Sequence, residues 1–154
     1  MFGAMFAPTP ERVASELFRV LKPGGLVAIA NYSSRGFLGR LAALAATFSP
    51  PASVEMPSPF LWADPDEVRR RFRGLASSID TAPRTLTFEF ESFERWLEFW
   101  EQTNPPQIAF KTILPPEVYR QLLNEMGRLV KEWNREKEGR VVLDSTYIQV
   151  LARK

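Results

Sequence analysis

Apolar and polar residues follow a helical spacing early in this chain and then a strand pattern. Thr9-Pro10-Glu11 suits a helix start, since threonine can cap and proline fits the first turn. The helix is expected to turn an apolar stripe inward, made by Val13, Leu17, Val20 and Leu21. Pro23-Gly24-Gly25 ends it, and residues 26–30 are wholly apolar, as in a strand covered on both faces within a parallel sheet. A helix, a glycine turn and a buried strand predict part of an α/β unit.

Two further helices are predicted in the next part of the chain. Residues 36–48 are rich in alanine and leucine, which favours a helix. The prolines between residues 49 and 59 predict an irregular stretch. Asp64 then precedes Pro65-Asp66-Glu67, a good capping arrangement for a helix whose apolar face contains Val68, Phe72 and Leu75.

The last third of the chain contains two predicted strands with helices between them. Residues 85–90 alternate threonine or glutamate with leucine or phenylalanine, a period of two that indicates a strand with one buried face. Ser92 should cap a short helix that ends at Pro105-Pro106. A long helix is predicted from Pro115 to about residue 137, where Gly139 stops it, and a final strand over residues 146–152. No linker is evident, so residues 1–154 are expected to form a single domain.

Composition excludes several kinds of chemistry. The chain has neither cysteine nor histidine, which removes thiolate metal sites, a cysteine nucleophile and the commonest general base, so no metal site is expected. A net charge of +2 gives no reason to expect nucleic-acid binding. Apolar runs such as residues 41–48 are far shorter than the ~20 residues of a membrane-spanning helix. We therefore expect a cytoplasmic protein without membrane contact.

The order of these segments resembles part of a known enzyme family. Phe2-Gly-Ala-Met-Phe-Ala-Pro8, Arg19-Val-Leu-Lys-Pro-Gly-Gly25 and Trp62-Ala-Asp-Pro-Asp-Glu67 are similar to segments of the class I S-adenosylmethionine-dependent methyltransferases, of the small-molecule type that includes quinone-biosynthesis enzymes. The resemblance covers nearly the whole chain but only the C-terminal half of the family's domain. It implies an α/β, Rossmann-like fold truncated at its N-terminal side. The sheet would be mixed with an antiparallel final hairpin, and the chain's last strand would lie between the two preceding ones.

The resemblance also implies S-adenosylmethionine as the cofactor and an apolar or aromatic methyl acceptor. A dinucleotide-type site needs a glycine-rich turn between a strand and a helix, and an acidic residue after the following strand. The sequence contains no GxGxG, and Gly24-Gly25 lies between a helix and a strand, the reverse order. We therefore expect the isolated chain to bind the cofactor poorly and to be inactive alone. The alternative is a non-catalytic binding or assembly module derived from a methyltransferase, so whether the chain acts as an enzyme stays open.

Six residues are candidate substrate contacts. By resemblance, the cleft would be lined by Phe2, Met5, Phe6 and Trp62. Asn31 and Tyr32 follow the strand at residues 26–30, at the end where α/β sheets place ligands. The alternatives are that Phe2, Met5 and Phe6 belong to the core or to a fraying terminus, and that Asn31 only forms a turn and helps to cap the next helix. The sequence offers no catalytic and no cofactor-binding residue.

Two side-chain clusters have a functional and a structural interpretation. One predicted helix carries several aromatic side chains, which would either cover a hydrophobic acceptor or fill the core, and the core is the better prediction. These residues are Phe93, Trp96, Phe99 and Trp100. Arg69-Arg70-Arg71 with Arg73 resembles a phosphate-binding patch, but neighbouring acidic residues favour a solvated helix face.

The strand at residues 26–30 would be exposed at one edge if the segment before it is missing. An apolar edge with unpaired backbone groups promotes association. The sequence therefore predicts a homodimer, or a partner chain that supplies the missing half. A hydrophobic small molecule is the other expected partner.

Overall fold

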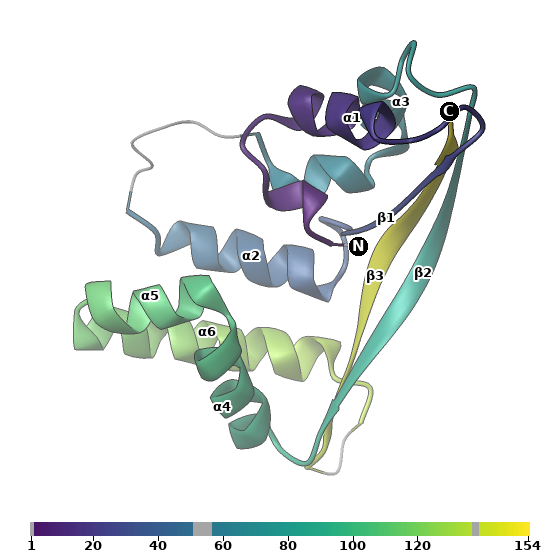
Figure 1. The fold of residues 1–154 in the computed structure, drawn as a ribbon. Coiled ribbons are helices and arrows are strands. Elements are labelled where there is room, and N and C mark those ends of the chain that lie inside the picture. The colour runs from purple at the N-terminus through teal and green to yellow at the C-terminus, as the bar shows by residue number, and fades with distance from the viewer. Residues whose placement is uncertain (1, 51–56, 137–138) are drawn as a thin grey trace. The chain divides into compact units, whose positions relative to one another are not determined.

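The computed structural model describes residues 2–50, 57–136 and 139–154. The described part of the chain has an α/β fold with three strands in one antiparallel sheet (Figure 1). Its elements, in chain order, are η1 (Ala4–Phe6), α1 (Pro10–Arg19), β1 (Leu26–Tyr32), α2 (Phe37–Thr47), η2 (Pro59–Ala63), α3 (Pro65–Arg71), β2 (Ser78–Phe90), α4 (Phe93–Thr103), α5 (Pro105–Ile113), α6 (Pro116–Trp133) and β3 (Val141–Arg153).

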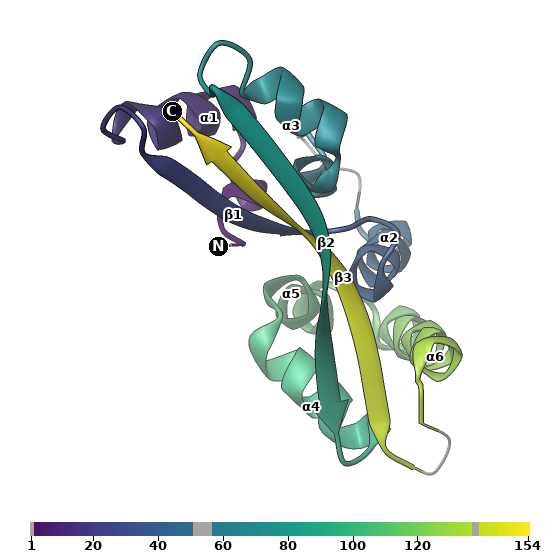
Figure 2. The same cartoon turned by 90° about the vertical axis from the view of Figure 1, so that its right-hand side faces the viewer.

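The sheet has the order β1-β3-β2, so the last strand of the chain occupies the centre. Figure 2 shows β3 running between the other two strands and opposite to both. β1 pairs antiparallel with β3, with Leu26 opposite Arg153 and Tyr32 opposite Tyr147. The predicted position of the final strand between the two earlier strands is therefore confirmed.

The expectation of a mixed sheet, with residues 26–30 in a parallel pairing covered on both faces, does not hold for the described strands. The only described neighbour of β1 is β3, which is antiparallel to it. Leu26 is 48% exposed and Ala28 is exposed, whereas Val27 and Ile29 are buried. Helices cover one face of the first part of β1, so alternate residues reach solvent even though all of them are apolar.

The other element predictions hold in kind, with different boundaries. Two of the three predicted side-chain caps form, since Asp64 accepts from the amides of Asp66 and Glu67, and Ser92 from that of Arg95. The cap predicted at Thr9 is wrong, because its side chain makes no capping hydrogen bond to α1. β2 and β3 are longer than predicted, and η2 was not predicted. The irregular stretch predicted for residues 49–59 falls partly on residues 51–56, outside the described part.

Pro105-Pro106 does not end the helical region as predicted. Instead Pro105 begins α5, because the side chain of Asn104 accepts a hydrogen bond from the amide of Gln107 and caps the helix. Proline at the first helical position loses no intrahelical hydrogen bond. The same dipeptide that stops α4 therefore starts another helix one residue later.

The described residues fall into two compact units. The first unit combines the described residues of the ranges 1–39, 54–86 and 145–154, and the second those of 40–53 and 87–144. The single domain expected from the sequence stays a prediction, and each unit is treated separately below.

The first unit has a core of apolar side chains between its helices and one face of β1 and β3. Phe18 and Phe72 meet edge to face with centroids 5.0 Å apart, and Phe72 contacts Trp62 in the same way at 6.1 Å. The predicted inward stripe of α1 is wrong for Val20, which is 66% exposed, while Ala14 and Phe18 are fully buried. The buried cluster consists of Met5, Ala14, Phe18, Val27, Ile29, Trp62, Val68, Phe72, Val150 and Ala152.

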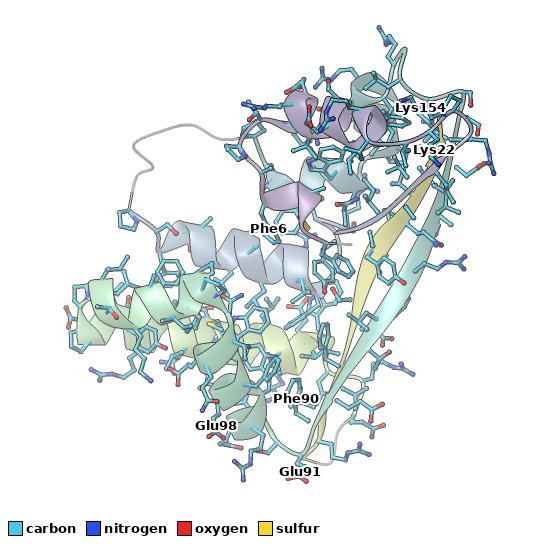
Figure 3. All side chains as sticks on the ribbon, in the orientation of Figure 1. Phe6, Lys22, Phe90, Glu91, Glu98 and Lys154 are labelled. Carbon is cyan, nitrogen blue, oxygen red and sulfur yellow. The ribbon has the colours of Figure 1, made fainter. Side chains whose placement is uncertain are left out.

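The last residue, Lys154, stabilises the turn between α1 and β1. Its ammonium Nζ donates to the carbonyl oxygens of Phe18 at 2.6 Å and Leu21 at 2.9 Å. These carbonyls lie at the C-terminal end of α1, where a positive charge is favourable. Figure 3 shows Lys154 beside Lys22, at the end of the sheet where β1 begins and β3 ends.

The second unit is built on α4, α5 and α6, with a polar network among its helices. Gln107, 2% exposed, donates through Nε2 to the Tyr119 hydroxyl at 3.1 Å, and that hydroxyl donates to Glu101. Lys111 pairs with Glu101 at 3.3 Å. Trp96, 2% exposed, stacks with Phe93 and Trp100, which favours the core interpretation of the aromatic helix. Phe99 on that helix remains 43% exposed.

Tyr119→Phe is expected to change how stability depends on alkaline pH. Burial, with the Glu101 hydrogen bond adding to it, raises the pKa of Tyr119 to about 12, above the ~10 of an unfolded chain. The native state therefore favours the protonated phenol. Its stabilising contribution is complete below about pH 10 and is lost as the pH rises through the folded pKa near 12.

Urea unfolding of wild type and Tyr119→Phe at pH 7, 9 and 11 measures this effect. At pH 7 the variant should be less stable by about 1–2 kcal/mol, because the buried Gln107 amide loses its acceptor. The difference between the two proteins should shrink at pH 11. A difference that stays constant with pH would contradict the raised pKa.

Candidate functional site

The candidate site lies in the first unit, at the C-terminal end of β1. Asn31 has no solvent exposure, and neither its amide nitrogen nor its amide oxygen has a hydrogen-bond partner in the described structure. By the two-residue period of the strand, Asn31 belongs to the same face as Val27 and Ile29, which contribute to the core. A buried amide normally finds partners, because leaving it unpaired is unfavourable. Asn31 therefore offers two donors and an acceptor to a bound group.

Aromatic rings surround the last residue of the strand. Phe2 stacks on Tyr32 with centroids 4.3 Å apart and an interplanar angle of 9°, and meets Tyr147 edge to face at 5.5 Å. Tyr147 is opposite Tyr32 on the neighbouring strand. Burial raises the pKa of Tyr32, so its phenol is neutral at physiological pH. The predicted contacts Phe2 and Tyr32 are thus brought together.

The other predicted contacts separate into two groups. Met5 and Trp62 are 3% and 1% exposed and belong to the core that covers the Val27 and Ile29 face of β1. Phe6 is 69% exposed and stands on η1 (Figure 3). The position of Met5 agrees with its core interpretation, and Trp62 is a core residue as well. The role of all three residues as substrate contacts stays a prediction.

Sequence reasoning missed Arg71. It was expected on a solvated helix face, but its side chain is 1% exposed and its guanidinium carbon lies 4.5 Å from the Trp62 ring centroid. Its Nη2 pairs with Glu67 at 3.0 Å, while Nη1 is buried without a partner in the described structure. Arg71 is three residues after Val68 and precedes Phe72, so its place on the buried stripe could have been read from the spacing.

The carboxylate of Glu67 joins two arginines of α3. Hydrogen bonding from Arg70, with the charge of Arg71 adding to it, lowers the pKa of Glu67 to about 2. Arg70 also pairs with Glu11 of α1 at 2.9 Å. Glu67 therefore stays ionised at neutral pH and serves as an anchor for Arg71, not as a general base.

A third buried polar group is the hydroxyl of Ser145, which has no partner in the described structure. It precedes Thr146, whose carbonyl accepts from the Ser33 amide at 3.0 Å, two residues after Asn31. Sequence analysis gave no signal for Ser145, since a serine within a strand is ordinary. All the unpaired buried side-chain groups found among the described residues lie in the first unit.

The residues present do not fit S-adenosylmethionine. The described glycines with positive φ, Gly24, Gly74 and Gly139, lie between a helix and a strand, the wrong order for a nucleotide-binding turn. Gly36 does follow a strand, β1, but a Cβ there would approach the Thr146 amide nitrogen to 3.1 Å. This glycine therefore makes room for the neighbouring strand β3, not for a cofactor. Among the described residues there is also no group of three acidic, histidine or cysteine side chains placed to hold a metal.

Comparisons with known proteins give relatives for most of the sequence but no family. No protein-family model matches the chain. The uncharacterized proteins Rv1403c of Mycobacterium tuberculosis and Mb1438c of Mycobacterium bovis are each 31% identical over 134 residues, covering 85% of this chain and 49% of the relative. Rv1405c of M. tuberculosis is 27% identical over 142 residues. The chain thus spans about half the length of these relatives.

A solved structure with partial similarity is BH2331, a candidate methyltransferase from Bacillus halodurans. It has a TM-score of 0.49 and 18% identity, and the alignment covers 99% of this chain and 66% of that one. Separately, none of the helices in the described ranges combines the length and apolar character needed to cross a membrane.

Proposed function

We propose that this chain is the acceptor-side part of an S-adenosylmethionine-dependent methyltransferase acting on an apolar or aromatic small molecule. The observation that carries the proposal is the strand order β1-β3-β2, with the final strand central and antiparallel. That order is what the resemblance of the sequence to small-molecule methyltransferases implies. The cytoplasmic location predicted from the sequence belongs to the same proposal.

The chain's contribution is to hold the acceptor. The unpaired Asn31 amide donates to or accepts from an oxygen of the acceptor. The Phe2–Tyr32 pair lies at the next strand position, on the opposite face of β1 by the same alternation, and its contact with the acceptor stays a prediction. Correct positioning of two reactants is a large part of the rate enhancement in group transfer. No side chain acts as a general base in this proposal, and the cofactor is held by a segment outside this chain.

The cofactor part of the proposal is tested by calorimetry. S-adenosylmethionine and S-adenosylhomocysteine, titrated separately into the purified chain, should give no binding heat. A chimera in which this chain replaces the matched part of Rv1403c should bind both and form S-adenosylhomocysteine with a phenol or quinol acceptor. Micromolar binding of either compound by the chain alone would overturn the proposal that a segment outside this chain holds the cofactor. A chimera that binds the cofactor but methylates nothing would favour the alternative below.

Asn31→Leu tests the acceptor contact and is expected to stabilise the protein by about 1–2 kcal/mol, because it removes an unsatisfied buried amide. In the chimera, the same substitution should abolish methyl transfer and leave cofactor binding intact. Urea unfolding and the two assays provide the measurements.

Asn134→Leu is the matched control for stability. Asn134 donates to the Arg140 carbonyl at 2.7 Å and accepts from the amides of Val142 at 2.7 Å and Glu136 at 3.2 Å. Its replacement should cost about 2–4 kcal/mol, since these three bonds are lost. If Asn31→Leu is as destabilising as this control, the Asn31 amide is satisfied in the native protein and is not reserved for a ligand.

The second candidate function is a non-catalytic binding or assembly module. The absence of a glycine loop from the sequence favours it, because such a module needs no cofactor. It predicts acceptor or partner binding without methyl transfer in the chimera.

A further inference from the structure

The outward face of α5, in the second unit, is apolar. Residues that follow one another at intervals of three and four share one face of a helix, and five exposed residues of α5 have this spacing. Two of them, Ile108 and Ile113, are 46% and 55% exposed. We call this surface the α5 outer face, and it consists of Pro105, Ile108, Ala109, Thr112 and Ile113.

The inward side of α5 contains a polar group instead. The buried residues of the helix are Phe110 and Gln107, and Gln107 donates to the Tyr119 hydroxyl. The single charged residue of α5, Lys111, pairs with Glu101 of α4. A surface helix normally buries its apolar residues and exposes its polar ones. The arrangement in α5 is close to the reverse, so its outer face is suited to apolar surroundings.

The helices packed against α5 have ordinary surfaces, which makes the contrast informative (Figure 1). α4 has four charged residues in eleven and α6 has six in eighteen, whereas α5 has one in nine. The hydroxyl of Thr112, the only polar side chain of the α5 outer face, donates to the Ile108 carbonyl at 3.4 Å. Contiguous exposed apolar surface of this kind marks an interaction site.

The start of α5 has no unsatisfied backbone donor. The first amides of a helix lack intrahelical partners, but Pro105 and Pro106 have no amide hydrogen. The amide of Gln107 donates to the Asn104 side chain at 3.1 Å, and that of Ile108 to the Asn104 carbonyl at 3.0 Å. Backbone groups must be satisfied in this way before a helix end can leave water for lipid.

A protein partner fits the α5 outer face poorly. A helix of nine residues is about 14 Å long, and its five outward residues are far fewer than the ~20–30 per side of a stable protein interface. The face also lacks the tryptophan, tyrosine and arginine side chains that provide most of the binding energy between proteins. A lipid bilayer needs neither, because aliphatic side chains that leave water are sufficient.

We propose that the α5 outer face inserts into the interfacial region of a lipid bilayer and attaches the chain to it weakly and reversibly. A helix that lies on a bilayer need not span it, so the expectation of no membrane contact, drawn from short apolar runs, does not apply to α5. The sequence of the second unit contains nine basic and eleven acidic residues, so attraction to anionic lipids does not drive the attachment. Attachment does not depend on methyl transfer, and its failure is separable from that of the proposed function.

Co-sedimentation of the full chain with vesicles of dioleoylphosphatidylcholine, a lipid without net charge, tests the attachment. Wild type should bind, and equally at low and at high salt, because the contact is apolar. The double variant Ile108→Ser/Ile113→Ser should bind at least about tenfold more weakly, since two aliphatic side chains no longer leave water. Val20→Ser is the matched control: it removes an aliphatic side chain that is 66% exposed in the first unit, and it should bind like wild type.

A fluorescent label locates the contact. The chain has no cysteine, so one introduced cysteine can carry a polarity-sensitive fluorophore. Vesicles should shift the emission of label at Ala109→Cys to the blue and leave that at Val20→Cys unchanged. This measurement decides the matter if the double variant does not fold.

Three results with vesicles would overturn the proposal: no binding, equal binding by the double variant, or binding that needs anionic lipid and disappears at high salt. An unchanged emission at position 109 in the presence of vesicles would overturn it as well. A blue shift that grows with protein concentration in the absence of vesicles identifies a second copy as the occupant, which also contradicts attachment to lipid.

Discussion

Gly39→Ala is expected to destabilise the protein by about 2–3 kcal/mol, although alanine is the better helix former. A Cβ at this position in α2 would lie 2.5 Å from the Cα of Ser34 and would also clash with the Ser33 carbonyl oxygen. These are backbone atoms of the turn between β1 and α2, so no side chain can move aside. The turn that follows the candidate site would have to shift, and urea unfolding measures the cost.

Gly127→Ala is the matched control, because it is also a glycine within a helix. There a Cβ would meet only the ring of Phe93, at 3.4 Å, which is ordinary contact. This substitution should stabilise the protein by up to about 1 kcal/mol through helix propensity. If Gly39→Ala and Gly127→Ala both stabilise the protein, α2 does not approach the preceding turn as closely as described.

Arg71→Ala is expected to cost about 3–4 kcal/mol, since it removes a buried guanidinium, its ion pair and a cation–π contact together. Arg69→Ala on the same helix is the control. Arg69 pairs with Asp66 at the surface, where both side chains are more than half exposed, and its loss should cost under about 0.5 kcal/mol. Denaturant midpoints of both variants provide the comparison.

A third variant separates packing from charge at the same position. Arg71→Met keeps the length of the side chain against Trp62 and removes a guanidinium whose Nη1 is unpaired. Glu67 retains its bond from Arg70. The methionine variant should therefore recover most of the stability lost in the alanine variant. Equal losses for methionine and alanine would show that the ion pair, not the packing, stabilises this region.

Local signals in the sequence predicted most of the elements. The caps at Asp64 and Ser92 and the apolar run at β1 need only neighbouring residues to form, so they could be read directly. The central position of β3 came from the family resemblance, because pairing between strands distant in sequence leaves no local pattern. Family resemblance and capping chemistry thus supplied complementary parts of the fold.

The predictions that failed depended on tertiary contacts. On α1, Ala14 and Phe18 are the most buried residues, whereas the predicted Val13 and Leu17 pack against the core only in part and Val20 is exposed, so hydropathy alone did not find the centre of the buried face. Arg71 was judged by its charge, yet its stem and guanidinium pack on Trp62. Asn31 was predicted as a contact, but the lack of partners that makes it a candidate depends on the groups around it. Sequence could select that residue and could not reveal its unmet hydrogen bonds.

The central place of β3 has a consequence during synthesis. β1 ends at Tyr32 and β2 at Phe90, whereas their shared neighbour begins at Val141. A ribosome adding ~5–20 residues per second therefore takes on the order of 5–20 seconds between completing β1 and reaching the strand that pairs with it. Throughout that interval the nascent apolar segment Leu-Val-Ala-Ile-Ala lacks β3 as its partner, and we expect it to be a binding site for chaperones.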